Sequence, residues 1–303
     1  MMFRVMPMHR NFQCQRNLIR LNRKKHLQMN WRFKSNRLNL NRHHHSRKTL
    51  IGHKGAEGAC MKLKVIGSSS KGNGYALIAD NEILLLECGC PFKEIKKAID
   101  WQILKIKGCL LTHGHSDHSK YTKDYLKAGI PVYTNEETIQ AVGEISGAQF
   151  YSVPEFKAVH IGRFKVIPFH IPHNGTPNFG YLIEHEEMGR LLFVTDYEYI
   201  PYNFQKQHVQ HFLIEANYQE QFIDKNLPNY EHKLLGHASL ETCIGAIKAN
   251  NSPNLRNIIM CHLGAGSSSG KYFINEMQKV TGRSINVNCA IPGLTVELDK
   301  SPF

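Results

Sequence analysis

From residue 61 onward the chain alternates short apolar runs with segments of amphipathic spacing, which predicts a mixed α/β domain. Pairs of apolar runs joined by turn residues predict β-hairpins at residues 75–86, 159–170 and 181–195. Single apolar runs predict further strands at residues 62–66, 106–111, 131–133, 211–215, 255–261, 284–287 and 294–298. Apolar residues at helical spacing predict helices at residues 92–99, 121–128, 136–142, 239–249 and 269–280.

The order of these elements predicts how the domain is layered. Strands first pair as hairpins and later alternate with helices, an order typical of two mixed β-sheets packed together with helices outside. Glycine and serine dominate residues 67–74, which predicts a turn rich in hydroxyl and amide groups. No Pro/Gly-rich linker interrupts residues 61–303, so we expect a single domain there.

Residues 1–60 differ from the rest of the chain in charge and hydropathy. They carry 14 Lys and Arg residues against one acidic residue, Glu57, and so hold the entire formal charge of +13, whereas residues 61–303 carry 24 basic and 24 acidic residues. Because the segment has no apolar period and cannot bury a core alone, we expect a basic, disordered extension. Three interpretations remain open: a segment outside the native protein, which would then start at Met61; an Arg-rich targeting peptide; or a basic arm for nucleic acid phosphates.

The cysteines and the apolar runs bear on the compartment. Eight cysteines occur without the regular spacing of a disulfide framework, which fits a reducing, intracellular environment. The chain has no run of about 18 apolar residues and no apolar signal-peptide region, so we expect no contact with a membrane. The sequence therefore predicts a cytoplasmic protein.

The densest cluster of chemically active residues follows the predicted strand at residues 106–111. His113, His115, Asp117 and His118 lie within six positions. Alternate residues of an extended loop point the same way, so His113 and His115 can share one ion while Asp117 and His118 face a second site. Imidazole nitrogens combined with carboxylate oxygens suit Zn²⁺, Mn²⁺ or Fe rather than Ca²⁺.

Three more candidate ligands stand directly after other predicted strands, and these are His173, Asp196 and His262. Taken singly, each would more often be a polar residue that ends a strand. Together with the first cluster, at the ends of successive strands, they favour a larger metal site.

These residues resemble the ligand pattern of the metallo-β-lactamase superfamily. The resemblance covers essentially residues 61–303 and implies a four-layer αβ/βα sandwich, with the site at one edge between two mixed sheets. It implies that His113, His115 and His173 hold one of two divalent ions, Zn²⁺ or Mn²⁺. It also implies that the other ion is held by Asp117, His118 and His262, and that Asp196 bridges both.

Further motifs indicate a subgroup. Residues 67–73, 236–239 and 261–263 resemble those of YycJ-type exonucleases and phosphoribosyl cyclic phosphodiesterases, and no insertion of the β-CASP type lies between Asp196 and His262. Glu215 and His237 resemble the paired motifs of the tRNA 3′-processing branch, which implies that His237 protonates the leaving oxygen and that Glu215 orients it. Glu87 departs from the pattern, because relatives usually carry Asp there.

The resemblance implies a dinuclear metal-dependent phosphodiesterase in which a hydroxide between the ions attacks phosphorus and Asp117 accepts a proton. We expect a nuclease of the YycJ type that acts on DNA. The balanced charge of residues 61–303 favours an alternative, a phosphodiesterase for small cyclic phosphates. A carboxyl- or lactam-directed hydrolase and a metal-stabilised binding module without catalysis are further alternatives.

Four polar residues are candidates for contact with a substrate phosphate, and these are Ser68, Ser69, Asn73 and Ser239. The alternative for the residues of the 67–74 segment is a solvated hairpin loop. The alternative for His237 is a structural neighbour of the helix that begins near Ser239.

Overall fold

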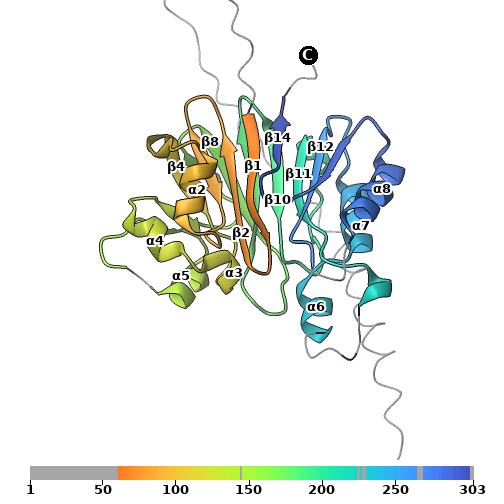
Figure 1. Cartoon of the computed structure of the whole chain (residues 1–303), viewed down its shortest axis with the longest axis horizontal. Coiled ribbons are helices and arrows are strands. Elements are labelled where there is room, and N and C mark those ends of the chain that lie inside the picture. Colours follow the sequence, from red (N-terminus) through yellow and green to blue (C-terminus); the bar gives the residue numbers. More distant parts are fainter. Residues whose placement is uncertain (1–60, 144, 224–225, 227–229, 265–268, 301–303) are drawn as a thin grey trace, which may run out of the picture. The chain divides into compact units, whose positions relative to one another are not determined.

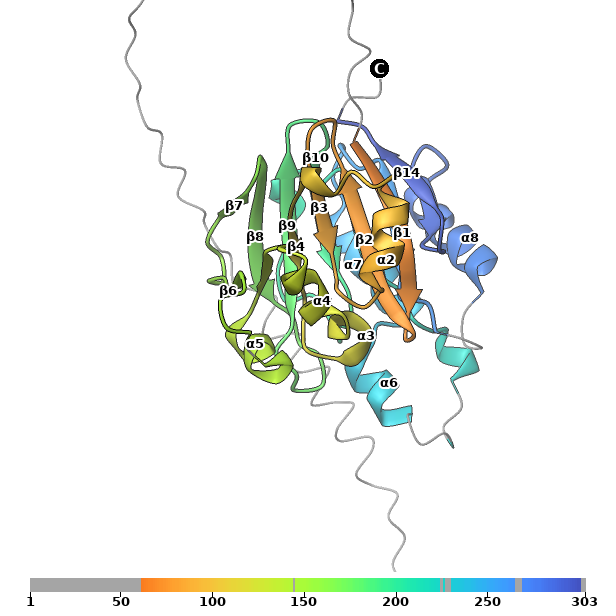
Figure 2. The ribbon, with the colours of Figure 1, turned by 60° about the vertical axis from the view of Figure 1, so that its left-hand side comes forward.

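The computed structural model describes residues 61–143, 145–223, 226, 230–264 and 269–300. Within them, two seven-stranded sheets lie face to face and carry helices on their outer faces (Figures 1 and 2). This four-layer arrangement confirms the fold predicted from the sequence. The predicted extension at residues 1–60 lies outside the described residues.

The first sheet has the strand order β14-β1-β2-β3-β4-β5-β6. Its strands are β1 (Met61–Ser69), β2 (Gly72–Ile78), β3 (Ile83–Leu86), β4 (Ile106–Leu110), β5 (Val132–Thr134), β6 (Phe150–Ser152) and β14 (Thr295–Leu298). Strands β14 to β3 pair antiparallel and β3 to β6 pair parallel. The sheet is therefore mixed, as hairpins followed by helical crossovers require.

The second sheet has the order β13-β12-β11-β10-β9-β8-β7. Its strands are β7 (Val159–Ile161), β8 (Phe164–His170), β9 (Phe179–His185), β10 (Gly189–Val194), β11 (His211–Glu215), β12 (Asn257–Cys261) and β13 (Asn286–Cys289). Antiparallel pairing from β7 to β10 again changes to parallel pairing from β10 to β13. Strands β8, β10, β11 and β12 consequently run in one direction and end at the same edge.

The helices cover the two outer faces. Helices α2 (Phe92–Ala98) and α4 (Thr122–Lys127) pack on the first sheet, and α7 (Leu240–Asn250) and α8 (Gly270–Thr281) pack on the second. The remaining α-helices within the described residues are α3 (Ser116–Ser119), α5 (Glu136–Val142) and α6 (Tyr230–Gly236). No helix within the described residues has the length and apolar composition that crossing a membrane requires.

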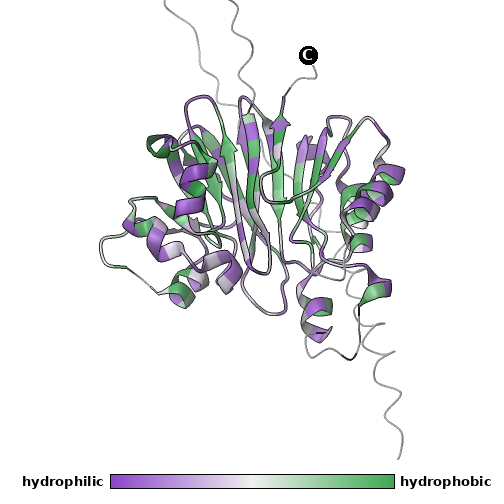
Figure 3. Cartoon of the chain, viewed as in Figure 1, coloured by the Kyte–Doolittle hydropathy of each residue, from purple (hydrophilic) through white to green (hydrophobic). Residues whose placement is uncertain are grey.

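The main core fills the space between the sheets. Alternation along β3 sends Leu84 and Leu86 into this core and Ile83 and Leu85 toward the helices, so all four side chains are buried. Hydrophobic colour follows the strands of both sheets in Figure 3. Burial of each such side chain stabilises the fold by about 1.5–3 kcal/mol, which holds the strand ends in place.

Some local features differ from those predicted from the sequence. Residues 67–74, predicted as a turn, mostly continue strands β1 and β2, and only residues 70 and 71 form the turn. The small residues allow close packing instead, because a Cβ atom on Gly67 would lie 2.6 Å from Cys90 Sγ. Strand β6 and helix α6 were not predicted, since two of the three β6 residues are exposed and α6 leaves Leu234 and Leu235 exposed.

Candidate metal centre

The candidate ligands gather at the edge where the aligned strands end. His113 and His115 follow β4, whereas Asp117 and His118 lie on the single helical turn of α3 rather than on an extended loop. The remaining three, His173, Asp196 and His262, follow β8, β10 and β12 respectively. The fold therefore brings all seven residues together from four separate parts of the chain.

A left-handed backbone turns two of these ligands into the site. Asp196 and His262 have φ angles of 50° and 51°, which non-glycine residues rarely adopt. Such a conformation costs of order 1–3 kcal/mol and persists where the surrounding structure imposes it. His262 directly follows β12 and Asp196 lies two residues after the end of β10, so the turn redirects each side chain out of the strand's alternating pattern.

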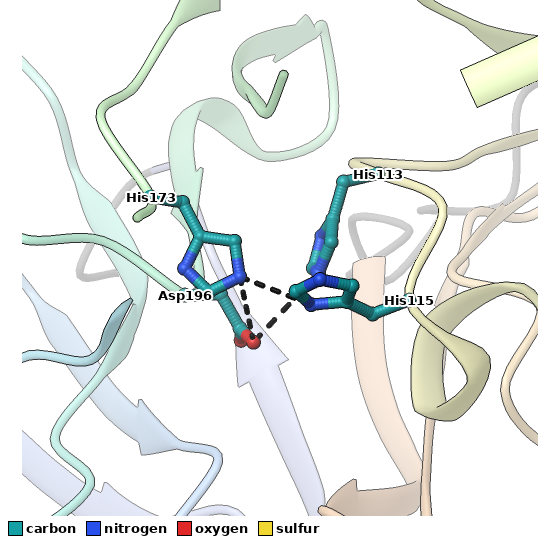
Figure 4. Close-up of side chains that lie close together, drawn as sticks. All are labelled: His113, His115, His173 and Asp196. Carbon is teal, nitrogen blue, oxygen red and sulfur yellow. Dashed lines mark hydrogen bonds and ion pairs between the residues drawn. The ribbon is translucent and has the colours of Figure 1, made fainter. Parts of the chain in front are cut away.

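The first cluster consists of His113, His115, His173 and Asp196 (Figure 4). His173 Nε2 lies 3.1 Å from His115 Nδ1, and Asp196 Oδ2 lies 3.8 Å from His113 Nε2 and 3.9 Å from His173 Nε2. His113 Nε2 is buried and has no hydrogen-bond partner among the described residues. Three ring nitrogens and a carboxylate oxygen that converge in this way match the donor set of a divalent transition-metal ion.

The second cluster consists of Asp117, His118, His262 and the same Asp196. Asp117 Oδ2 lies 3.3 Å from His118 Nε2 and 3.1 Å from His262 Nε2. Asp196 Oδ1 lies 3.3 Å from His118 Nε2, so its two carboxylate oxygens face different clusters. The two buried clusters together are consistent with a dinuclear metal site in which Asp196 is shared.

Neighbouring groups orient the histidine rings. Thr112 Oγ1 lies 2.9 Å from His113 Nδ1. His173 Nδ1 lies 2.6 Å from the carbonyl oxygen of Gly236, which can only accept, so Nδ1 carries the hydrogen and Nε2 is left to face the cluster. Contacts of this kind fix the tautomer of metal-binding histidines in proteins.

The protonation states of the first cluster also suit a metal ion. Burial lowers the pKa of His113 far below its usual value, and burial lowers the pKa of His173 to about 4. Burial alone would raise the pKa of Asp196, but the charges of His262 and His118 outweigh it and lower this pKa. Neutral imidazoles beside an ionised carboxylate are the forms that bind metal.

In the second cluster, neighbouring carboxylates raise the pKa values of the two histidines. Burial would lower the pKa of His262, yet Asp196 and Asp117 raise it to about 10. The pKa of His118 is raised in the same way, against burial, by Asp196 and Glu87. Protons on these two rings would have to leave when an ion binds, so we expect metal affinity in this cluster to fall with decreasing pH.

Glu215 and His237 form a third group at the same edge. His237 Nδ1 lies 2.7 Å from Glu215 Oε1 and 3.8 Å from Asp196 Oδ2. The His237 ring stacks on that of His262, with 5.2 Å between centroids and 16° between planes. Glu215 is fully buried, whereas the His237 side chain is 10% exposed, so His237 borders the metal clusters on the accessible side.

The four candidate phosphate contacts lie in different surroundings. The Ser68 hydroxyl accepts a hydrogen bond from the His262 backbone at 2.9 Å, and the buried Asn73 amide lies beside Asp117. Ser69 is partly buried, and its hydroxyl accepts from the Lys71 backbone. Ser239 is the N-cap of α7 and accepts from Thr242 N at 3.1 Å. A phosphate contact by any of them stays a prediction.

Several residues that shape the site were not predicted. Asn217 donates to the His262 carbonyl at 2.8 Å, and Thr112 and Gly236 contact two of the ligand rings. Thr112 adjoins the first motif and could have been noticed there. The Gly236 contact uses a backbone carbonyl, for which the sequence carries no signal.

Comparison with known proteins agrees with this fold and site. A family model described as the metallo-beta-lactamase superfamily matches residues 70–206. Exodeoxyribonuclease YycJ of Bacillus anthracis is 30% identical over 150 residues, which are 46% of this chain and 56% of that protein. Exodeoxyribonuclease WalJ of Streptococcus pneumoniae is 25% identical over 221 residues, which are 67% of this chain and 81% of that protein.

The solved structures extend the match beyond that segment. The metallo-beta-lactamase fold protein YhfI from Bacillus subtilis superposes with a TM-score of 0.63 and 17% identity, and it covers 78% of this chain and 99% of its own. This chain thus combines a metallo-β-lactamase fold of two mixed sheets with a centre of seven His and Asp residues at one edge. The chain belongs to the metallo-β-lactamase superfamily and is distantly related to the YycJ and WalJ exodeoxyribonucleases.

Proposed function

We propose that this protein is a dinuclear metal-dependent phosphodiesterase, and that its substrate is DNA, from which it removes terminal nucleotides. The single observation that carries the proposal is the convergence of two ligand clusters on Asp196 with His237 at their accessible border. The distant relationship to two exodeoxyribonucleases supports the choice of DNA.

The proposed roles follow from the positions of the side chains. His113, His115 and His173 would hold one divalent ion, Asp117, His118 and His262 the other, and Asp196 both. Two bound ions supply a lowered pKa for a water molecule and charge neutralisation at a phosphate. Zn²⁺ and Mn²⁺ both fit the nitrogen and oxygen donors.

His237 is proposed to protonate the leaving oxygen. Its Nδ1 faces Glu215 Oε1 at 2.7 Å, so that carboxylate fixes the ring and leaves Nε2 as the only other proton donor. Glu215 also accepts from the backbone nitrogen of Ala238 at 3.2 Å, which holds the carboxylate itself. A histidine held in this way by a buried carboxylate can act as a general acid, which supports the proposed role.

A small phosphodiester is the second candidate substrate. Residues 61–303 carry equal numbers of basic and acidic residues. A protein that binds long nucleic acid usually presents a basic surface, so the charge balance favours a compact substrate.

A paired assay of the full chain separates these candidates. Metal-loaded protein would be given end-labelled single- and double-stranded DNA and RNA in one arm, and bis(p-nitrophenyl) phosphate with cyclic phosphates in the other. The double variant Asp117→Ala/His118→Ala is the control, since both changes remove ligands of the second cluster. Ligand-dependent shortening of DNA supports the nuclease, cleavage of the small esters alone supports the second candidate, and no ligand-dependent turnover in either arm contradicts both.

A further inference from the structure

Residues 67–74 include a side chain that contacts the second metal cluster, although the proposed catalytic roles do not use it. Asn73 on β2 is fully buried, yet its side chain faces the second cluster. Its amide nitrogen Nδ2 lies 3.3 Å from Asp117 Oδ2 and 3.2 Å from His118 Nε2. Asp117 Oδ2 is the same atom toward which His262 Nε2 points at 3.1 Å.

Backbone acceptors fix which end of this amide faces the cluster. Nδ2 also lies 3.2 Å from the carbonyl oxygen of Ser69 and 3.4 Å from that of Asp117. Because carbonyl oxygens only accept, the NH₂ group must be on this side. The other end, Oδ1, faces the hydroxyl of Tyr75 at 3.5 Å, at the outer limit of a hydrogen bond.

A chain of buried hydroxyls continues from this point to the other sheet. The Tyr75 hydroxyl lies 2.8 Å from Ser68 Oγ, and Ser68 Oγ accepts the backbone N–H of His262 at 2.9 Å. Asp117 follows the first sheet and His262 the second. Asn73, Tyr75 and Ser68 therefore connect two ligands of one cluster across the gap between the sheets.

We propose that Asn73 is a positioning residue for the second metal cluster, acting through the Asp117 carboxylate and supported by Tyr75 and Ser68. The inference rests on the proposed function, because it assumes that this cluster binds an ion. The first cluster has other supports, Thr112 and Gly236, so loss of Asn73 affects the two ions unequally.

Calorimetric titration of the chelator-stripped full chain with Zn²⁺ tests the inference without measuring catalysis. Asn73→Leu keeps a similar volume and removes the donor. We expect it to bind one ion as the wild type does and the second about 10- to 100-fold more weakly. Lys71→Ala is the matched control, since Lys71 is exposed in the same β1–β2 turn, and it should bind both ions as the wild type does.

Tyr75→Phe keeps the test decisive if Asn73→Leu does not fold. It removes only the hydroxyl that joins Asn73 to Ser68. Loss of these two contacts, of which the one to Asn73 is at the outer limit of a hydrogen bond, predicts a second-ion affinity about twofold to tenfold weaker. Unchanged affinity for both ions in whichever variants fold overturns the role of Asn73 while leaving the proposed function intact. A wild-type chain that binds no ion overturns the proposed function, and this inference with it.

Discussion

The backbone of Gly89 lies directly against the backbone of Asp117. A Cβ atom added to Gly89 would be only 1.7 Å from the Asp117 carbonyl oxygen. The same Cβ would be 2.6 Å from Asn73 N. Both atoms belong to the backbone and cannot move as a side chain tip would. The single turn of α3, which carries the proposed ligand Asp117, can therefore take this position only because residue 89 has no side chain.

Gly89→Ala is therefore predicted to weaken the second metal cluster and to lower the free energy of unfolding by about 1–3 kcal/mol through overpacking. Zn²⁺ titration and urea unfolding of the full chain measure the two effects. Gly245→Ala, in the middle of α7 where an added Cβ meets no atom within 4 Å, is the control and should be neutral or stabilising. Equal behaviour of the two variants would show that the close approach has no functional consequence.

His211 predicts a pH dependence of stability away from the metal clusters. The ring is fully buried, its Nε2 lies 3.1 Å from the Met188 carbonyl oxygen, and its Nδ1 accepts from Asn257 Nδ2 at 2.9 Å. These partners favour the neutral ring. Burial, with a smaller contribution from Arg256, lowers its pKa to about 4, against the opposing effects of the Met188 hydrogen bond and of Asp299.

His211 binds a proton more readily in the unfolded chain than in the folded chain. The contribution of neutral His211 to the free energy of unfolding is therefore complete above pH 6.5 and is lost as the pH falls toward 4. By pH 5 the loss should reach about 2 kcal/mol. Urea unfolding at pH 7.5 and 5.0, with chelator throughout, measures it against His211→Gln. The variant's stability should fall less between the two pH values, and an equal fall in both proteins would refute the assignment.

The leaving group distinguishes a general acid from a structural histidine at position 237. DNA leaves an alkoxide that needs a proton, whereas p-nitrophenolate leaves without one. His237→Ala should therefore slow DNA cleavage about 10²- to 10⁴-fold and change bis(p-nitrophenyl) phosphate cleavage much less. His160→Ala, an exposed histidine on β7, is the control. Equal losses on both substrates would assign His237 to the structure of the site.

The sequence predicted the fold because the elements follow simple periodicities. Paired apolar runs such as those in residues 75–86 predicted antiparallel hairpins, and the later predicted strands alternated with amphipathic helices. The strand ends also indicated where His173, Asp196 and His262 would gather. Short or exposed elements such as β6 and α6 carry too little apolar pattern to be predicted.

Local geometry at the site was less accessible from sequence. The left-handed backbones of Asp196 and His262 are uncommon even for Asp and His, which adopt them more often than most non-glycine residues, so residue type alone does not predict them. The glycines near residue 67 suggested a turn, but the structure uses them for close packing. The roles of Gly236 and Gly89 depend on backbone atoms, which residue identity alone does not place.

The two clusters that share Asp196 are proposed to work as one dinuclear centre. Stepwise addition of Mn²⁺ to the chelator-stripped full chain, with ions bound and cleavage of bis(p-nitrophenyl) phosphate followed together, tests it most directly. Activity should appear mainly with the second ion bound per chain and be absent in Asp196→Ala. Full activity with one ion bound, or none with two, would show that the two clusters do not work as a dinuclear centre.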